Sequence, residues 1–98
     1  MNTYIYLIHP LRDGFFEAHN AAEQAAMEAH FAYLQAATAA GTVVLAGPCL
    51  DDTFGLVIFH AVDESAAQAF MMNDPSVQAN VMMAELHPLR ISLAGSLG

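Results

Sequence analysis

The sequence predicts an α+β protein of the ferredoxin-like type, with the order strand, helix, strand, strand, helix, strand. Two observations predict it. Four short apolar runs bounded by turn residues alternate with two alanine-rich stretches of helical periodicity. Right-handed crossovers would then place both helices on one face of a four-stranded antiparallel sheet, in the strand order 4-1-3-2. We expect the whole chain, residues 1–98, to form a single domain.

The first strand is expected from Thr3 to His9, with Pro10 ending it. Its central residues, from Tyr4 to Ile8, are apolar or aromatic at every position, whereas a strand with one wet face alternates. This strand is therefore predicted to be buried on both faces.

The first helix is expected to begin after Asn20, an N-cap residue whose capping box Glu23 would close three positions later. A start near Glu17 is the alternative. The alanine-rich body runs to Ala40, and Gly41 ends it because glycine takes the left-handed C′ conformation without a Cβ clash.

One face of this helix carries residues that recur at spacings of three and four, which is the period of an α-helix. They are Met27, His30, Phe31, Leu34 and Thr38. His30 is therefore expected to point toward the region that Phe31 and Leu34 bury.

A second strand is predicted over residues 42–46, ended by Gly47 and Pro48, and a third over residues 54–61. The polar turn between them, residues 49–53, makes the pair a hairpin with a long loop.

The second helix is expected to begin near Asp63 and to run to about Asn73, because Asp74 precedes a proline and so avoids the helical region. After a short turn at residues 76–80, the last strand is predicted from Met82 to Leu93, and Pro88 within it implies an edge position or a bulge. The inner face of the second helix is assigned to Ala66, Ala67, Phe70 and Met71.

The composition predicts a partner for the sheet. The chain is 56% hydrophobic and 12% charged, and two helices can cover one face of a sheet whose central strands are apolar on both. A second copy of the chain, related by a twofold axis, would cover the open face. We therefore expect a homodimer through that face.

The charge balance excludes some partners. Arg12 and Arg90 are the basic residues against ten acidic ones, for a formal net charge of −8, which repels phosphate backbones and anionic lipid. Neither nucleic acid nor a membrane is expected as a partner. One cysteine and a start without secretory-signal character predict a cytoplasmic location.

Several segments together resemble the YCII-related family of the dimeric α/β barrel superfamily. They are HFAYL, GTVVLAGP, the FG opening the third strand, DESAAQAF, NDP and LHPLRISL. The resemblance implies a ferredoxin-like subunit that pairs into a dimeric α/β barrel with a pocket in each subunit. It also maps the family's suspected active-site pair onto His30 and Asp74. Relatives include muconolactone isomerase-like enzymes, acid–base lyases and cofactor-free monooxygenases.

This pair suggests a chemistry. Imidazole exchanges protons near neutral pH, and a neighbouring carboxylate can orient it, so proton transfer on a small cyclic or aromatic compound needs no cofactor. We therefore expect a lyase or isomerase in which His30 is the general acid or base and Asp74 orients it. A non-catalytic small-molecule binding module and a cofactor-independent monooxygenase are the alternatives. In the structural alternative, His30 is a satisfied core histidine and Asp74 caps a turn.

Two further residues are candidate substrate contacts. Tyr33, three residues after His30, would either donate a hydrogen bond to an enolate or sit at an interface with its hydroxyl in water. Arg12 would either hold a substrate carboxylate or neutralise Asp13.

His9 and His87 are also candidate ligand-binding residues, because the first and last strands are neighbours in the predicted sheet. A metal site formed by these two with His30 and Asp74 matches no compact ligand motif, so neither a metal nor a cofactor is expected. Cys49 has no basic flanking residue to activate it and is assigned a structural role.

Overall fold

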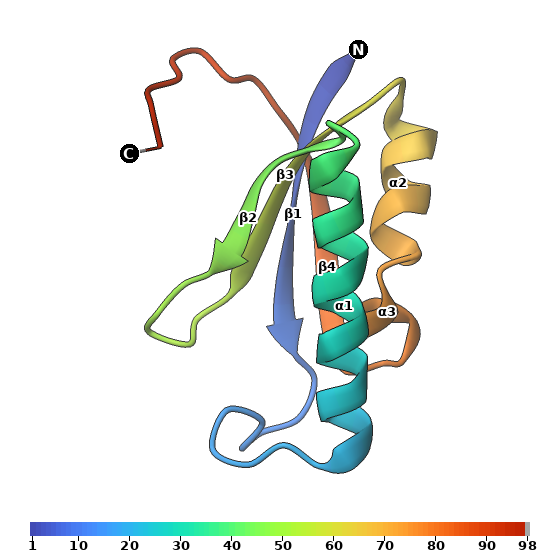
Figure 1. The fold of residues 1–98 in the computed structure, drawn as a ribbon, viewed down its shortest axis with the longest axis vertical. Coiled ribbons are helices and arrows are strands. Elements are labelled where there is room, and N and C mark those ends of the chain that lie inside the picture. Colours follow the sequence, from blue (N-terminus) through green and yellow to red (C-terminus); the bar gives the residue numbers. More distant parts are fainter. Residues whose placement is uncertain (98) are drawn as a thin grey trace.

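The computed structural model describes residues 1–97, which form four strands and three helices around one sheet (Figure 1). The strands are β1 (Asn2–Pro10), β2 (Val43–Pro48), β3 (Gly55–Ala61) and β4 (Met82–Leu89), and the helices are α1 (Ala21–Ala39), α2 (Glu64–Met72) and α3 (Pro75–Gln78). The sheet is antiparallel with the order β2-β3-β1-β4. The predicted ferredoxin-like α+β fold and its strand order are confirmed.

The two outer strands differ from their predicted bounds. β4 ends at Leu89 rather than Leu93, because Leu89 pairs with Thr3 and the neighbouring strand begins one residue before Thr3. β2 continues through Gly47 and Pro48, which had been expected to stop it, and Pro48 pairs with Gly55. A proline is tolerated there because an edge strand needs no N–H on its outer side.

Local sequence signals set the limits of α1 as predicted. The Asn20 side chain accepts a hydrogen bond from the Glu23 backbone amide at 2.8 Å, and the Asn20 amide donates to the Glu23 carboxylate at 2.9 Å. At the other end, Gly41 has a φ of +84°, and the Thr42 amide donates back to the Ala37 carbonyl. The helix therefore begins with a capping box and ends in a left-handed glycine.

The loop between β1 and α1 is fixed to the helix by an ion pair. Arg12 donates to both oxygens of Glu23 at 2.7 Å and to the Ala18 carbonyl at 2.6 Å. Glu23 is 7% exposed, and Phe15 of the same loop is buried. The loop thus closes one end of the core.

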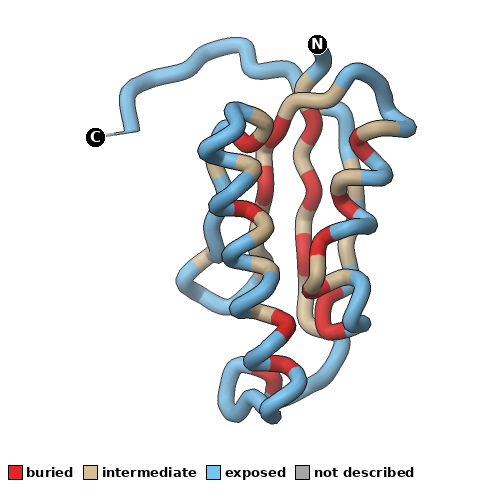
Figure 2. Tube along the Cα trace, turned by 45° about the vertical axis from the view of Figure 1, so that its right-hand side comes forward, coloured by how far each residue is buried: buried red, intermediate tan, exposed pale blue. Residues whose placement is uncertain are grey.

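The core lies between the sheet and the helices (Figure 2). Alternate residues of β1, namely Tyr4, Tyr6 and Ile8, are buried on the helix side together with Val57 and Phe59 of β3. The two tyrosines therefore lie under the helices.

The other face of the sheet is uncovered in a single chain. Ile5 pairs with Ile58 and Leu7 with Leu56, and these four side chains alternate with the buried ones, so they point away from the helices. Each is partly exposed. Within residues 1–97, no helix is both long and apolar enough to cross a bilayer.

The Arg12–Glu23 contact predicts a pH dependence of stability. Hydrogen bonds from Arg12 and from the Asn20 amide lower the pKa of Glu23 to about 2. The pKa of a glutamate in the unfolded chain is about 4.3, so ionised Glu23 stabilises the fold above that pH. The contribution is lost as the pH falls toward 2.

The wild type is expected to have a lower free energy of unfolding at about pH 2.5 than at about pH 5, and in Glu23→Gln this decrease should be smaller. Urea unfolding at both pH values measures it. Glu28→Gln, on the exposed surface of the same helix, should keep the wild-type difference. The same pH difference in Glu23→Gln and the wild type would contradict the assignment.

Candidate functional site

Asp74 is a fully buried carboxylate in the turn between α2 and α3. Pro75 holds it in an extended conformation, with φ −62° and ψ 124°, so that it becomes the N-cap of α3. Its Oδ1 accepts hydrogen bonds from the Ser76 amide at 2.9 Å and from the Ser76 hydroxyl at 2.8 Å. The capping role foreseen in the structural alternative is thus present.

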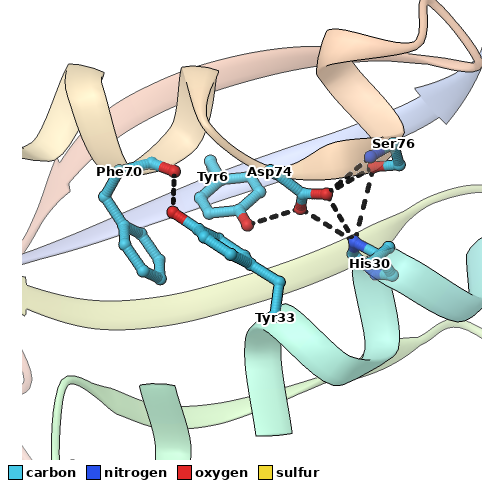
Figure 3. A network of polar contacts seen from close by, with 6 residues as sticks. All are labelled: Tyr6, His30, Tyr33, Phe70, Asp74 and Ser76. Atoms are coloured by element: carbon cyan, nitrogen blue, oxygen red, sulfur yellow. Dashed lines mark hydrogen bonds and ion pairs between the residues drawn. The ribbon is translucent and has the colours of Figure 1, made fainter. Parts of the chain in front are cut away.

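Two further donors reach the same carboxylate from other elements (Figure 3). The Tyr6 hydroxyl of β1 donates to Oδ2 at 2.7 Å, and Nδ1 of His30 in α1 lies 2.8 Å from both oxygens. The Ser76 hydroxyl is 3.4 Å from the same His30 nitrogen. Asp74 therefore joins β1, α1 and α3 at one point.

The electrostatics of this cluster keep Asp74 ionised and Tyr6 neutral. Burial alone raises the pKa of Asp74, but the hydrogen bond and charge of His30, with donors Tyr6 and Ser76, outweigh it and lower the pKa. Burial and the adjacent carboxylate raise the pKa of Tyr6 far above its ordinary value.

The hydrogen bond fixes the state of the His30 ring. An ionised carboxylate can only accept, so Nδ1 carries the proton, and in the neutral ring Nε2 holds a free lone pair. Within the part of the chain that is described, no hydrogen bond reaches Nε2, and the side chain is 13% exposed. His30 is therefore an oriented imidazole with one nitrogen available.

His30 lines a cavity of about 880 Å³ between α1 and the β2–β3 side of the sheet. Figure 1 shows that the C-terminal end of β2 lies away from α1, and that α2 and α3 lie on the other side of α1. The wall is mainly apolar, with contributions from Ile8, Met27, Phe31, Leu34, Val57 and Met82. The predicted helical face of α1 is thus the wall of a cavity.

Residues 4–87 match the sequence profile of the YCII-related domain, which identifies the family. The chain belongs to the YCII-related domain family. No curated protein matches the sequence. Among solved structures, it is similar to 5-chloro-2-hydroxyhydroquinone dehydrochlorinase (TftG) from Burkholderia phenoliruptrix AC1100, in complex with 2,5-dihydroxybenzoquinone. The TM-score is 0.66 at 21% identity, over 89% of this chain and 93% of that one, which is a likeness of fold.

In this YCII-related domain, Tyr33 lies on the flank of α1 that faces α2. Its hydroxyl donates to the Phe70 carbonyl at 2.7 Å, and its ring stacks on Phe70 with centroids 5.1 Å apart. Burial raises the pKa of Tyr33. The hydroxyl is therefore engaged by the protein itself, in neither of the two environments that the sequence suggested.

Arg12 also lies away from the cavity. Its guanidinium is paired with Glu23 rather than with the Asp13 carboxylate, because Glu23 comes within reach when the loop folds back on the first turn of α1. The contact with Asp13 is to the backbone carbonyl.

His9 and His87 lie on the opposite face of the sheet from His30. Both contact Glu85, which lies 3.4 Å from His9 Nε2 and 2.8 Å from His87 Nε2. The structure therefore does not bring these two histidines together with His30 and Asp74. Across residues 1–97, no cluster of three or more histidine, cysteine or carboxylate side chains could hold a metal ion.

The sequence reasoning missed Tyr6 and Ser76 as partners of Asp74. Ser76 had a local signal, since the residue two positions after an aspartate N-cap commonly donates its amide to the carboxylate. Tyr6 had none, because it lies 68 residues away.

We expect Tyr6→Phe to lower the free energy of unfolding by about 1.5–3 kcal/mol, because it removes a hydrogen bond to a buried charge. Tyr4→Phe is the matched control: Tyr4 lies on the same face of β1, and within residues 1–97 its hydroxyl does not bond Asp74. It should cost less than about 0.5 kcal/mol. Urea unfolding at neutral pH measures both, and equal costs would contradict the proposed anchoring by Tyr6.

Proposed function

We propose that this protein is a small cofactor-free enzyme of the lyase or isomerase type, with His30 as its proton-transfer group. The observation that supports it is the pairing of His30 Nδ1 with a fully buried carboxylate while the same ring lines the cavity. A core histidine with a structural role needs no cavity beside it.

In the proposed step, His30 Nε2 removes a proton from a ring hydroxyl or from a carbon next to a carbonyl. The electron pair left behind forms an enolate or phenolate, or expels a leaving group from a tetrahedral carbon next to the deprotonated carbon. On an aromatic ring, return of the proton to the chlorine-bearing carbon first makes that carbon tetrahedral, and deprotonation of a second ring hydroxyl then expels chloride and leaves a quinone. Asp74 stabilises the imidazolium that forms and keeps its ring in place. Return of the proton to another carbon completes an isomerisation, whereas departure of an anion completes an elimination.

The substrate proposed is a small cyclic or aromatic metabolite. The cavity volume, about 880 Å³, falls within the range of about 300–1,000 Å³ typical of ligand pockets. The similar structure is a dehydrochlorinase of a substituted hydroquinone, and loss of HCl from such a ring is an elimination. That likeness supplies a first probe, 5-chloro-2-hydroxyhydroquinone.

We expect His30→Ala and Asp74→Asn to lower kcat/KM by about 100-fold or more. Alanine removes the base, and the asparagine amide no longer holds the proton on Nδ1. Activity is measured as chloride release from 5-chloro-2-hydroxyhydroquinone and as deuterium incorporation into cyclic ketones, detected by NMR.

His19→Ala is the control for loss of an imidazole, because His19 lies in the exposed loop before α1. Circular dichroism and thermal unfolding establish that each variant folds. A wild-type protein without turnover, in which His30→Ala keeps ligand affinity within a few-fold, would favour the binding-module alternative.

We also propose that the protein forms a homodimer through the open face of the sheet. The partly exposed side chains of Ile5, Leu7, Leu56 and Ile58 form a continuous apolar surface across β1 and β3. The same surface on a second copy is self-complementary about a twofold axis.

Ile58→Glu is therefore expected to give a monomer, because it places a charge at the centre of this surface. Sedimentation equilibrium measures the mass. Gln68→Glu, on the exposed side of α2, adds the same charge and should leave the dimer intact. A monomeric wild-type protein would refute the dimer.

A further inference from the structure

The cavity wall carries no formal charge, except when His30 is protonated. Among the described residues, the lining includes no arginine, lysine, aspartate or glutamate. Its polar members besides His30 are Gln35, Thr38 and Cys49. The Thr38 hydroxyl donates to the Leu34 carbonyl at 2.7 Å, so it can only accept from a ligand.

Neither arginine of the chain lies where it could supply a positive charge to the cavity. Arg12 is bidentate to Glu23 and also bonds the Ala18 carbonyl. Arg90 is exposed just after β4, where it lines a separate surface hollow with Asn2 and Thr3, and it is not part of the cavity lining.

The His30–Asp74 pair does not attract anions either. With a neutral imidazole, the pair has a charge of −1, and protonation brings it to zero. A carboxylate or phosphate entering the cavity would lose part of its hydration without gaining a counter-charge, in a protein whose net formal charge is −8.

We infer that the site selects uncharged substrates, namely neutral phenols, quinols and cyclic ketones without a carboxylate or phosphate group. This inference rests on the proposed function. Proton transfer from a neutral substrate to His30 leaves a substrate with a single negative charge beside one imidazolium, which serves as its counter-charge. A substrate that arrives as an anion would end the step with a second negative charge.

Affinity for a matched pair of ligands tests the inference. The neutral 2-naphthol and the anionic 6-hydroxy-2-naphthoate share a ring system and a hydroxyl, and their fluorescence is readable because the chain has no tryptophan. We expect the carboxylate to bind at least 10-fold more weakly than the neutral compound.

Gln35→Arg should reverse this selectivity. Gln35 lines the cavity five residues after His30, which is about 7.5 Å along the helix and near the length of the two fused rings. An arginine there offers a bidentate contact to the carboxylate, and we expect the affinity for 6-hydroxy-2-naphthoate to rise at least 10-fold. Gln24→Arg adds the same charge at an exposed position of α1 that lies eleven residues, or about 16 Å, before Gln35 and outside the cavity, and it should change neither affinity.

Equal affinity of the wild type for the two naphthols would overturn the inference, and so would the absence of binding by either. An equal gain in Gln35→Arg and Gln24→Arg would also overturn it, because overall charge would then control binding. The proton-transfer function is judged separately, by deuterium incorporation in wild type and His30→Ala. A failure of the charge selectivity would therefore not refute the proposed chemistry, which the deuterium assay tests independently.

Discussion

The burial of the Asp74 carboxylate is the constraint on which the rest of the structure depends. A carboxylate with no exposed surface needs donors from the protein, because an unpaired buried charge is strongly destabilising. Tyr6, His30 and Ser76 provide them, and each comes from a different element. The position of α1 against β1 and the sharp turn into α3 are therefore linked through one side chain.

The same arrangement separates the two sides of α1. The flank toward α2 is filled by the stacked rings of Tyr33 and Phe70, and the Tyr33 hydroxyl donates to the Phe70 backbone carbonyl. The flank toward β2 is left unfilled and forms the cavity. His30 lies between them, held by Asp74 on one ring nitrogen and free on the other. The fold thus gives an immobilised imidazole access to an apolar space.

Much of the fold follows from local signals in the sequence. Three signals are each confined to a few neighbouring residues, so the local sequence predicts them. They are the capping box of Asn20 and Glu23, the left-handed Gly41 and the helix break at Pro75. The ends of β2 and β4 do not follow in this way, because each depends on how far the neighbouring strand extends.

Local sequence signals predict less of the candidate site than of the fold. His30 and Asp74 are 44 residues apart, and their pairing was expected from the family resemblance rather than from any periodicity. Arg12 was expected beside Asp13 or a substrate, but the ion pair with Glu23 depends on the path of the loop. Tyr33 needed the position of α2, which the spacing along α1 does not reveal.

Proline occupies both rims of the sheet, at Pro48 in β2 and Pro88 in β4. Each lacks the N–H that an incoming strand would have to engage, so the sheet resists lengthening by edge-to-edge addition of further chains. For a chain this rich in apolar residues, that protection matters, because unguarded rims would favour fibrous aggregates. In the proposed homodimer, association uses the flat surface of the sheet instead, where a twofold contact closes with two copies.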